Sequence, residues 1–250
     1  MKLLVVVIIF YLAICALLYL FQRQLLYFPT SKIQHSFAET LLKSGQDVVK
    51  LITVNPERQQ ALIYFGGNAE VVAQSAGELQ TQLADVTVYL LNYRGYGGST
   101  GMVSEKHNYH DALAVYDYIK NKHKQIHVLG RSLGSGVATY LATQRNIEKL
   151  ILITPFDSIE NVAQEKFPFF PVKFLLRDKY RSNERAKNIH KPVLIIAAEQ
   201  DEVIPRERTE ALASEFSEQQ LSYVVIPEAM HNDISDHDAY YRNLSEFIKN

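Results

Sequence analysis

A serine stands between two glycines in the stretch GRSLG, residues 130–134, and this G-x-S-x-G pattern can present a nucleophile. The apolar run 125–129 before it predicts a strand, and residues 135–145 after it predict a helix. A sharp strand-to-helix turn would project Ser132 at a helix N-terminus, where N–H groups and the helix dipole favour a developing oxyanion. A glycine-rich turn with a serine N-cap is the alternative. The strand before and the helix after favour the nucleophile.

A serine nucleophile needs a base, and the base needs an orienting carboxylate. Where the nucleophile lies on a turn of this kind, the acid follows it in the chain and the histidine comes last. Asp201 comes shortly after the predicted strand 193–197. Asp157, after the predicted strand 150–153, is the alternative acid. We favour Asp201 because of its spacing from the preceding strand.

Only two of the eight histidines, His231 and His237, lie beyond both Ser132 and Asp201. His231 comes shortly after the last predicted strand, in a loop that can place its ring over the serine. His237 adjoins the last predicted helix, and we interpret it as a solvated residue at the helix start. The sequence therefore predicts that Ser132 attacks, His231 transfers the proton and Asp201 fixes the imidazole tautomer.

An oxyanion hole for this serine needs two N–H donors. One is predicted to be the backbone N–H of Leu133, directly after the nucleophile. The loop after the first core strand reads FGGNAE, residues 65–70, and its glycines allow the backbone to approach a substrate. We expect the second donor to be the N–H of Asn68, with Gly67 as the fallback. A simple glycine turn is the alternative.

A second glycine-rich loop, NYRGYGGSTG at residues 92–101, follows the next predicted strand. It must make tight turns beside the site, and its Tyr96 is a candidate for the substrate pocket. A phosphate-binding loop is disfavoured, because no Lys-Ser/Thr pair follows and the G-x-G-x-x-G spacing is absent.

Short apolar runs alternate with helical patterns along residues 31–250, which predicts βαβ units, a mainly parallel sheet and one domain. An earlier run at 48–52 is expected to be an antiparallel strand. The core strands are expected at 61–65, 86–91, 125–129, 150–153, 193–197 and 221–226, and the helices at 69–83, 105–121, 135–145, 206–216 and 238–249.

Residues 159–189 separate two of these strands by more than a single helix needs. The insertion is either an ordinary connection or a small cap that gives the site an apolar wall. Its aromatic stretch FPFFP, residues 167–171, would suit an acyl-chain pocket or contact with a membrane surface. Phe169 and Phe170 are the candidate pocket residues.

The N-terminal run Leu3–Phe21 has 19 residues without a charge. A helix of this length spans about 28 Å, which is enough for the hydrocarbon core of a bilayer. We expect residues 1–30 to be an uncleaved membrane anchor. A cleaved signal peptide is the alternative, but the run is long for one and lacks an A-x-A site. The flanking charges orient the helix weakly, and we favour a domain outside the cytoplasm.

The composition limits the other classes of function. The formal net charge is −1, which gives no support for binding nucleic acid. The one cysteine, Cys15, lies in the apolar N-terminal run, so the domain has no disulfide, cysteine nucleophile or thiolate metal site. We expect no metal and no cofactor.

In order along the chain, the motifs FGGNAE, LNYRGYGGSTG, LGRSLGSG, TPFDSI, EQDEVIP and MHNDI, with the anchor and QLLYFP before them, resemble the α/β-hydrolase-fold serine hydrolases. More narrowly, the chain looks like the small membrane-anchored group that includes eukaryotic depalmitoylases and bacterial relatives. The resemblance implies hydrolysis of esters or thioesters, without a cofactor, and supports Asp201 over Asp157. One departure is Gly66, where the family usually has a histidine.

Two function classes follow. The first is a membrane-tethered carboxylesterase or acyl-thioesterase that acts on a small, possibly lipid-like acyl substrate through Ser132, with a peptidase of the same fold as a subordinate form. The second is a non-catalytic, membrane-tethered binding protein. Since candidates for the serine, the acid and the histidine are all present, we favour the enzyme.

Overall fold

The strands form one sheet of eight, in the order β1-β2-β4-β3-β5-β6-β7-β8, in a computed structural model that describes residues 1–250. β1 and β2 pair antiparallel, as do β2 and β4, and the other neighbours are parallel. The predicted mainly parallel sheet is confirmed. The strands are β1 (Ala38–Ser44), β2 (Asp47–Val54), β3 (Gln60–Phe65), β4 (Val86–Asn92), β5 (Gln125–Arg131), β6 (Leu150–Ile153), β7 (Val193–Ala198) and β8 (Leu221–Ile226).

The core strands are buried along almost their whole length. β4, β6 and β7 are buried at every residue, as continuous apolarity predicts for strands covered on both faces. β1 has no such run, since most of its residues are partly or fully exposed at the sheet edge. The sequence pattern therefore did not reveal β1.

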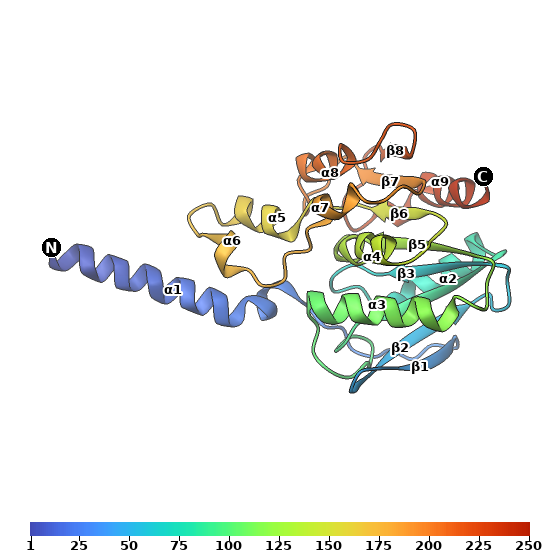
Figure 1. Ribbon diagram of the computed structural model, residues 1–250, viewed down its shortest axis with the longest axis horizontal. Coiled ribbons are helices and arrows are strands. Elements are labelled where there is room, and N and C mark those ends of the chain that lie inside the picture. Colours follow the sequence, from blue (N-terminus) through green and yellow to red (C-terminus); the bar gives the residue numbers. More distant parts are fainter.

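Helices cover both faces of the sheet (Figure 1). α3 (Glu105–Ile119), α4 (Leu133–Gln144) and α8 (Arg206–Ala213) bury apolar side chains in one core, on one face. α2 (Val72–Gln82) and α9 (Asp238–Lys249) do so in a second core, on the other face. The sheet is packed between the two cores, and it positions the loops at the carboxyl ends of its strands.

The insertion at residues 159–189 forms a small cap, but none of its residues lines the pocket that contains Ser132, so the expected apolar wall is not formed there. The cap contains α5 (Ile159–Lys166), α6 (Val172–Leu175) and α7 (Ser182–Ala186). α7 packs with α4 in the main core, whereas α5 and α6 extend away from the sheet toward the N-terminal helix (Figure 1).

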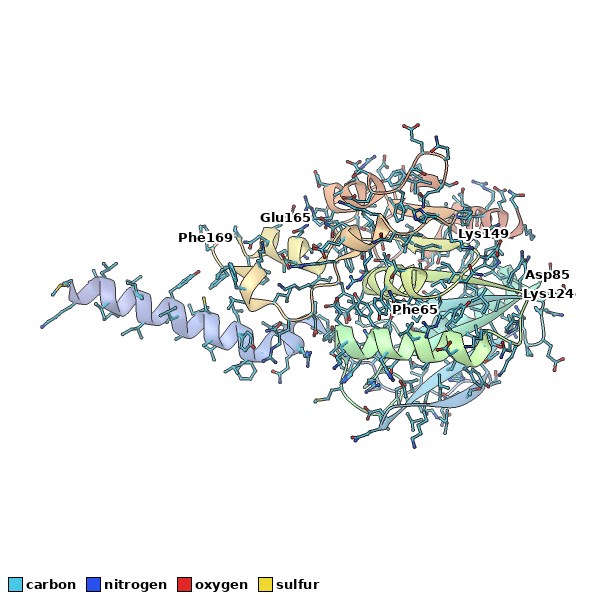
Figure 2. All side chains as sticks on the ribbon, in the orientation of Figure 1. Phe65, Asp85, Lys124, Lys149, Glu165 and Phe169 are labelled. Atoms are coloured by element: carbon cyan, nitrogen blue, oxygen red, sulfur yellow. The ribbon has the colours of Figure 1, made fainter.

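The N-terminal helix α1 spans Lys2–Leu26 and is long and apolar enough to cross a membrane. It projects from the end of the molecule at which the cap lies (Figure 1). Asp85 and Lys124, which directly precede β4 and β5, lie at the opposite end (Figure 2). The carboxyl ends of the parallel strands are therefore directed toward α1.

Candidate active site

The turn between β5 and α4 places Ser132 in a strained backbone conformation, with φ of 49° and ψ of −117°. Two glycines make the turn possible. A Cβ atom at Gly130 would collide with the carbonyl oxygen of Gly134, and one at Gly134 would collide with that of Phe65. The Ser132 N–H donates to the Ile153 carbonyl at 2.9 Å, which fixes the turn to β6. The local geometry is that of a nucleophile elbow.

Ser132, His231 and Asp201 form one hydrogen-bonded chain. The Nε2 atom of His231 lies 2.9 Å from the Ser132 hydroxyl oxygen. Its Nδ1 atom lies 2.8 Å and 3.0 Å from the two carboxylate oxygens of Asp201. The three residues come from loops after β5, β8 and β7, which meet at one edge of the sheet. The structure thus brings together the three side chains that the sequence singled out.

The Asp201 carboxylate is itself held in place. Its Oδ1 atom accepts hydrogen bonds from the N–H groups of Val203 at 2.9 Å and Ile204 at 2.7 Å. The side chains of Asp201 and His231 are each only 6% exposed, so water competes little for their contact.

The alternative acid and base lie in other networks. Asp157 accepts from the Asn161 amide at 2.6 Å and from the Arg208 guanidinium at 3.2 Å. The imidazole of His237 lies 3.7 Å from the Asp233 carboxylate. Neither residue contacts Ser132 or His231 through a hydrogen bond.

The two candidate N–H donors in the loop after β3 differ in whether they already have a hydrogen-bond partner. The Gly67 N–H donates to the Glu70 carboxylate at 2.6 Å and is therefore occupied. The Asn68 N–H has no acceptor within the protein. Leu133 begins α4, where first-turn N–H groups lack intrahelical partners. Leu133 and Asn68 thus remain the two predicted donors, and Gly67 is not available as the fallback unless Glu70 moves.

A pocket of about 500 Å³ opens at Ser132 and His231. Its lining is mostly polar and includes the oxyanion loop, Arg131 and the exposed Phe28 just after α1. Tyr96 is not part of this lining. Its ring is buried and its hydroxyl donates to the Asn68 side chain at 2.8 Å, so Tyr96 supports the oxyanion loop and does not form a pocket wall.

The two phenylalanines of the cap have different positions. Phe170 lines an apolar cavity of about 260 Å³ between the cap and α1. Phe169 is 85% exposed and lies at the tip of the cap (Figure 2), outside that lining. Neither phenylalanine lines the pocket at Ser132; Phe170 lines a separate apolar cavity, and its role in substrate binding stays a prediction.

No group of three or more His, Cys, Asp and Glu side chains is placed to hold a metal ion. The one cysteine, Cys15, lies in α1, away from the triad. The chemistry available at Ser132 is consequently that of a hydroxyl, an imidazole, a carboxylate and backbone N–H groups.

Comparison with known proteins identifies the family. A family model for the alpha/beta hydrolase fold matches residues 60–178. An uncharacterised protein of Mycobacterium tuberculosis is 34% identical over 231 residues, which cover 85% of this chain and 81% of the relative. The chain belongs to the α/β-hydrolase fold family.

Other members of the α/β-hydrolase fold family are also similar. The alpha/beta hydrolase domain-containing protein WAV2 of Arabidopsis thaliana is 28% identical, over 94% of this chain and 89% of the WAV2 chain. Lysophosphatidylserine lipase ABHD12 of Mus musculus is 34% identical, but over only 58% of this chain and 42% of its own. Est1E of Butyrivibrio proteoclasticus, solved with ferulic acid bound, superposes with a TM-score of 0.70 at 20% identity, over 84% of this chain and 97% of Est1E. The last comparison shows the fold alone.

The departure from the family at Gly66 has a structural reason. A Cβ atom there would lie 2.6 Å from Val72 Cγ1 and 3.2 Å from the Glu70 carboxylate. Glu70 fills this space and bonds the Tyr64 hydroxyl at 2.7 Å and the Ser75 hydroxyl at 2.8 Å, in addition to the Gly67 N–H. In this α/β hydrolase, a partly buried carboxylate thus orders the loop after β3.

Two further supporting residues were not found by sequence reasoning. Arg131 donates to the carbonyl oxygens of His231 at 3.3 Å and Asn232 at 2.9 Å, which holds the histidine loop against the elbow. Glu202 accepts from the His231 N–H at 3.1 Å. Both directly adjoin a predicted catalytic residue, but their partners lie far away in the chain, so only the tertiary structure reveals these roles.

Proposed function

We propose that this protein is a membrane-anchored serine hydrolase that cleaves carboxylic esters or acyl thioesters through an acyl-enzyme intermediate. The observation that carries the proposal is the hydrogen-bonded chain from Ser132 through His231 to Asp201, at a strained strand-to-helix turn. A hydrolase of this fold with that geometry has every group that acyl transfer requires.

In the first half-reaction, His231 Nε2 accepts the Ser132 proton while the serine oxygen attacks the acyl carbon. The oxyanion of the tetrahedral intermediate accepts hydrogen bonds from the N–H groups of Leu133 and Asn68. Protonated His231 then donates to the leaving alcohol or thiol, which departs and leaves the acyl group on Ser132. Asp201 stabilises the imidazolium and keeps its Nδ1–H oriented.

In the second half-reaction, a water molecule takes the place of the leaving group. His231 accepts its proton as it attacks the acyl carbon, and the same oxyanion hole stabilises the second tetrahedral intermediate. Collapse of this intermediate returns the proton to the Ser132 oxygen and releases the carboxylic acid.

A membrane location is supported by α1 and by the direction of the sheet. α1 is uncharged from Leu3 to Phe21, and Lys2 and Arg23 flank this run. The carboxyl edge of the sheet, where Ser132 lies, faces the same end of the molecule (Figure 1). With α1 as an uncleaved anchor and its N-terminus in the cytoplasm, the domain at residues 31–250 lies outside the cytoplasm and its site is close to the bilayer.

The substrate class rests on the acyl chemistry of the triad and on the membrane location. The relative named lysophosphatidylserine lipase is consistent with a lipid-like acyl ester, although the match spans less than half of that protein. We propose an ester or thioester with an acyl chain that is accessible at a membrane surface.

A fluorophosphonate probe tests the nucleophile. The full chain in detergent micelles should be labelled covalently, and Ser132→Ala should abolish the labelling because the reactive oxygen is gone. Ser135→Ala is the matched control: Ser135 lies in the first turn of α4 and is buried, and its hydroxyl has no hydrogen-bond partner. Its labelling should equal that of the wild type. A folded wild type that takes up no label would favour a non-catalytic binding protein.

A further inference from the structure

The apolar cavity of about 260 Å³ has walls from two distant parts of the chain. Leu18, Gln22, Leu25 and Leu26 of α1 form one wall, and the cap forms the other with Ile159, Ala163, Phe167, Phe170, Val172, Leu175 and Leu176. Ten of these eleven residues are hydrophobic. A cavity with such a lining favours an apolar ligand over water. A methylene group is about as large as a water molecule, so the cavity has room for roughly nine methylene groups.

Polar contacts fix the cap to α1, so the helix is a structural wall and not only a tether. Arg23 forms a bidentate ion pair with Asp178, with distances of 2.8 and 3.2 Å. The amide of Gln22 uses both of its ends: Nε2 donates to the Leu175 carbonyl at 3.0 Å, and Oε1 accepts from the Arg177 N–H at 2.6 Å. These contacts explain why a glutamine and an arginine close an otherwise apolar helix.

The contacts also set the depth of the cap along α1. The Tyr11 hydroxyl donates to the Phe169 carbonyl at 2.9 Å, and the Tyr11 ring stacks on Phe170 at 5.7 Å. From Tyr11 to Gln22 the helix rises about 16 Å, which is close to the thickness of one leaflet's hydrocarbon. If α1 spans the bilayer, the tip of the cap therefore lies inside one leaflet.

The surface of the cap fits that environment. Phe169 and Phe174 are 85% and 81% exposed; Phe169 lies at the tip of the cap (Figure 2), and Phe174 lies in α6, which contacts α1. Such large exposed aromatics are typical of a surface that contacts lipid. Lys173, which is exposed and comes shortly after the FPFFP stretch, has a long stem that can carry its charge toward the headgroups.

The end of α1 lies between the apolar cavity and the candidate catalytic pocket, which share no lining residue. Leu26 lines the apolar cavity, and Phe28, two residues later, lines the pocket at Ser132. Asn68 of the oxyanion loop joins them, because its amide donates to the Leu26 carbonyl at 2.6 Å and accepts from the Phe28 N–H at 3.1 Å. An extended acyl chain attached at Ser132 therefore has an apolar site just beyond this segment.

We propose that the cavity between α1 and the cap binds the acyl chain of a bilayer lipid, so that the substrate is a long-chain acyl ester or thioester that enters from the leaflet. The proposal rests on the proposed hydrolase function and adds the substrate's chain length and route. In this arrangement the anchor helix forms half of the specificity site.

Filling the cavity tests the proposal. Leu18 lines the cavity, whereas its neighbour Leu17 is 55% exposed on the outer face of α1. Leu18→Trp should block the cavity, and Leu17→Trp should not, although both place the same side chain on the same helix. Hydrolysis is measured for p-nitrophenyl acetate and butyrate in detergent, and for p-nitrophenyl laurate and palmitate carried in phosphatidylcholine vesicles that contain the full chain.

We expect Leu18→Trp to lower kcat/KM for laurate and palmitate by about tenfold or more, because the chain loses its apolar site. The acetate and butyrate values should stay within about twofold of the wild type, as should all values for Leu17→Trp. Equal effects of Leu18→Trp on short and long esters, or equal effects of the two variants, would overturn the proposal.

A binding measurement separates this proposal from the hydrolase function itself. A palmitic acid with a photoreactive diazirine near its methyl end is cross-linked to the Ser132→Ala variant in vesicles, and the labelled peptides are mapped by mass spectrometry. Labels should fall on the α1 and cap peptides that line the cavity and disappear in Ser132→Ala/Leu18→Trp. Labels elsewhere, or labels unchanged by Leu18→Trp, would refute the acyl site. Labels in the cavity of a protein that hydrolyses no ester would refute only the hydrolase.

Discussion

His231 joins the candidate nucleophile to the candidate acid through its two ring nitrogens, at 2.9 Å and 2.8 Å. We expect His231→Ala to lower kcat for p-nitrophenyl butyrate by about a thousandfold or more, because no other side chain can take the serine proton. His237→Ala should leave kcat nearly unchanged, since its ring lies beside Asp233 and not beside Ser132. Steady-state kinetics of the two variants make the comparison. A severe loss in His237→Ala with little loss in His231→Ala would mean that the wrong base has been assigned.

The three triad residues could be predicted from the sequence, whereas the second oxyanion donor could not be fixed from it. Chain order and distance from a strand were enough to select Ser132, Asp201 and His231, because the fold brings the loops after parallel strands to one edge. The choice between the Asn68 and Gly67 N–H groups depended on the Glu70 carboxylate, which folds back over the loop. Such a contact follows from tertiary packing and has no signature in residue spacing.

At the scale of elements, the end of α1 is connected to the oxyanion loop by the side chain of Asn68. That side chain makes hydrogen bonds to Leu26, Phe28 and the Tyr96 hydroxyl, at 2.6, 3.1 and 2.8 Å. Asn68→Ala keeps the backbone N–H but removes all three contacts. We expect kcat for p-nitrophenyl butyrate to fall by about tenfold with little change in KM, because a loosened donor stabilises the transition state less than a fixed one.

The variant Tyr96→Phe tests whether the loss in kcat depends on how many of these contacts are removed. It removes one of the three contacts and keeps the ring, so its loss in kcat should be smaller than that of Asn68→Ala. If Asn68→Ala raises KM and leaves kcat unchanged, the side chain contributes to substrate binding and does not position the donor. If neither variant differs from the wild type, the connection between α1 and the loop has no role in catalysis.

The elements also differ in how far the sequence determines them. Fully buried strands such as β6 and β7 can be predicted from their continuous apolar runs. The helices between the strands were predicted to within a few residues of their observed bounds. β1 was missed because an exposed edge strand needs no apolar run. The insertion was recognised by its length, but its docking on α1 depends on pairs such as Arg23–Asp178, which are 155 residues apart.

At the scale of the whole molecule, one buried histidine outside the site makes stability depend on pH. His127 lies in β5 and is 1% exposed, and neither of its ring nitrogens has a hydrogen-bond partner. Burial, with a smaller contribution from the charge of Lys149, lowers the pKa of His127 to about 4. The folded protein therefore keeps this imidazole neutral at pH values where the unfolded chain, with a pKa near 6.5, binds a proton.

Folding lowers the pKa of His127, so protonation destabilises the folded state. Stability is therefore intact above the pKa of the unfolded chain and falls as the pH decreases from about 6.5 toward about 4. Between about pH 7.5 and about pH 5 the wild type should lose about 2 kcal/mol through this residue. For a chain of this size, that loss corresponds to a decrease of roughly 4–8 °C in Tm. His127→Leu removes the titrating group from the buried site and should abolish this part of the decrease.

Far-ultraviolet circular dichroism of the full chain in a nonionic detergent measures Tm at the two pH values. The informative quantity is the change in Tm with pH, compared between wild type and His127→Leu, because it cancels the packing cost of the substitution itself. His190→Gln is the control: this histidine is exposed, and water surrounds its imidazole before and after unfolding. It should keep the pH dependence of the wild type. An equal decrease in Tm for wild type and His127→Leu would show that the acid sensitivity arises elsewhere in the molecule.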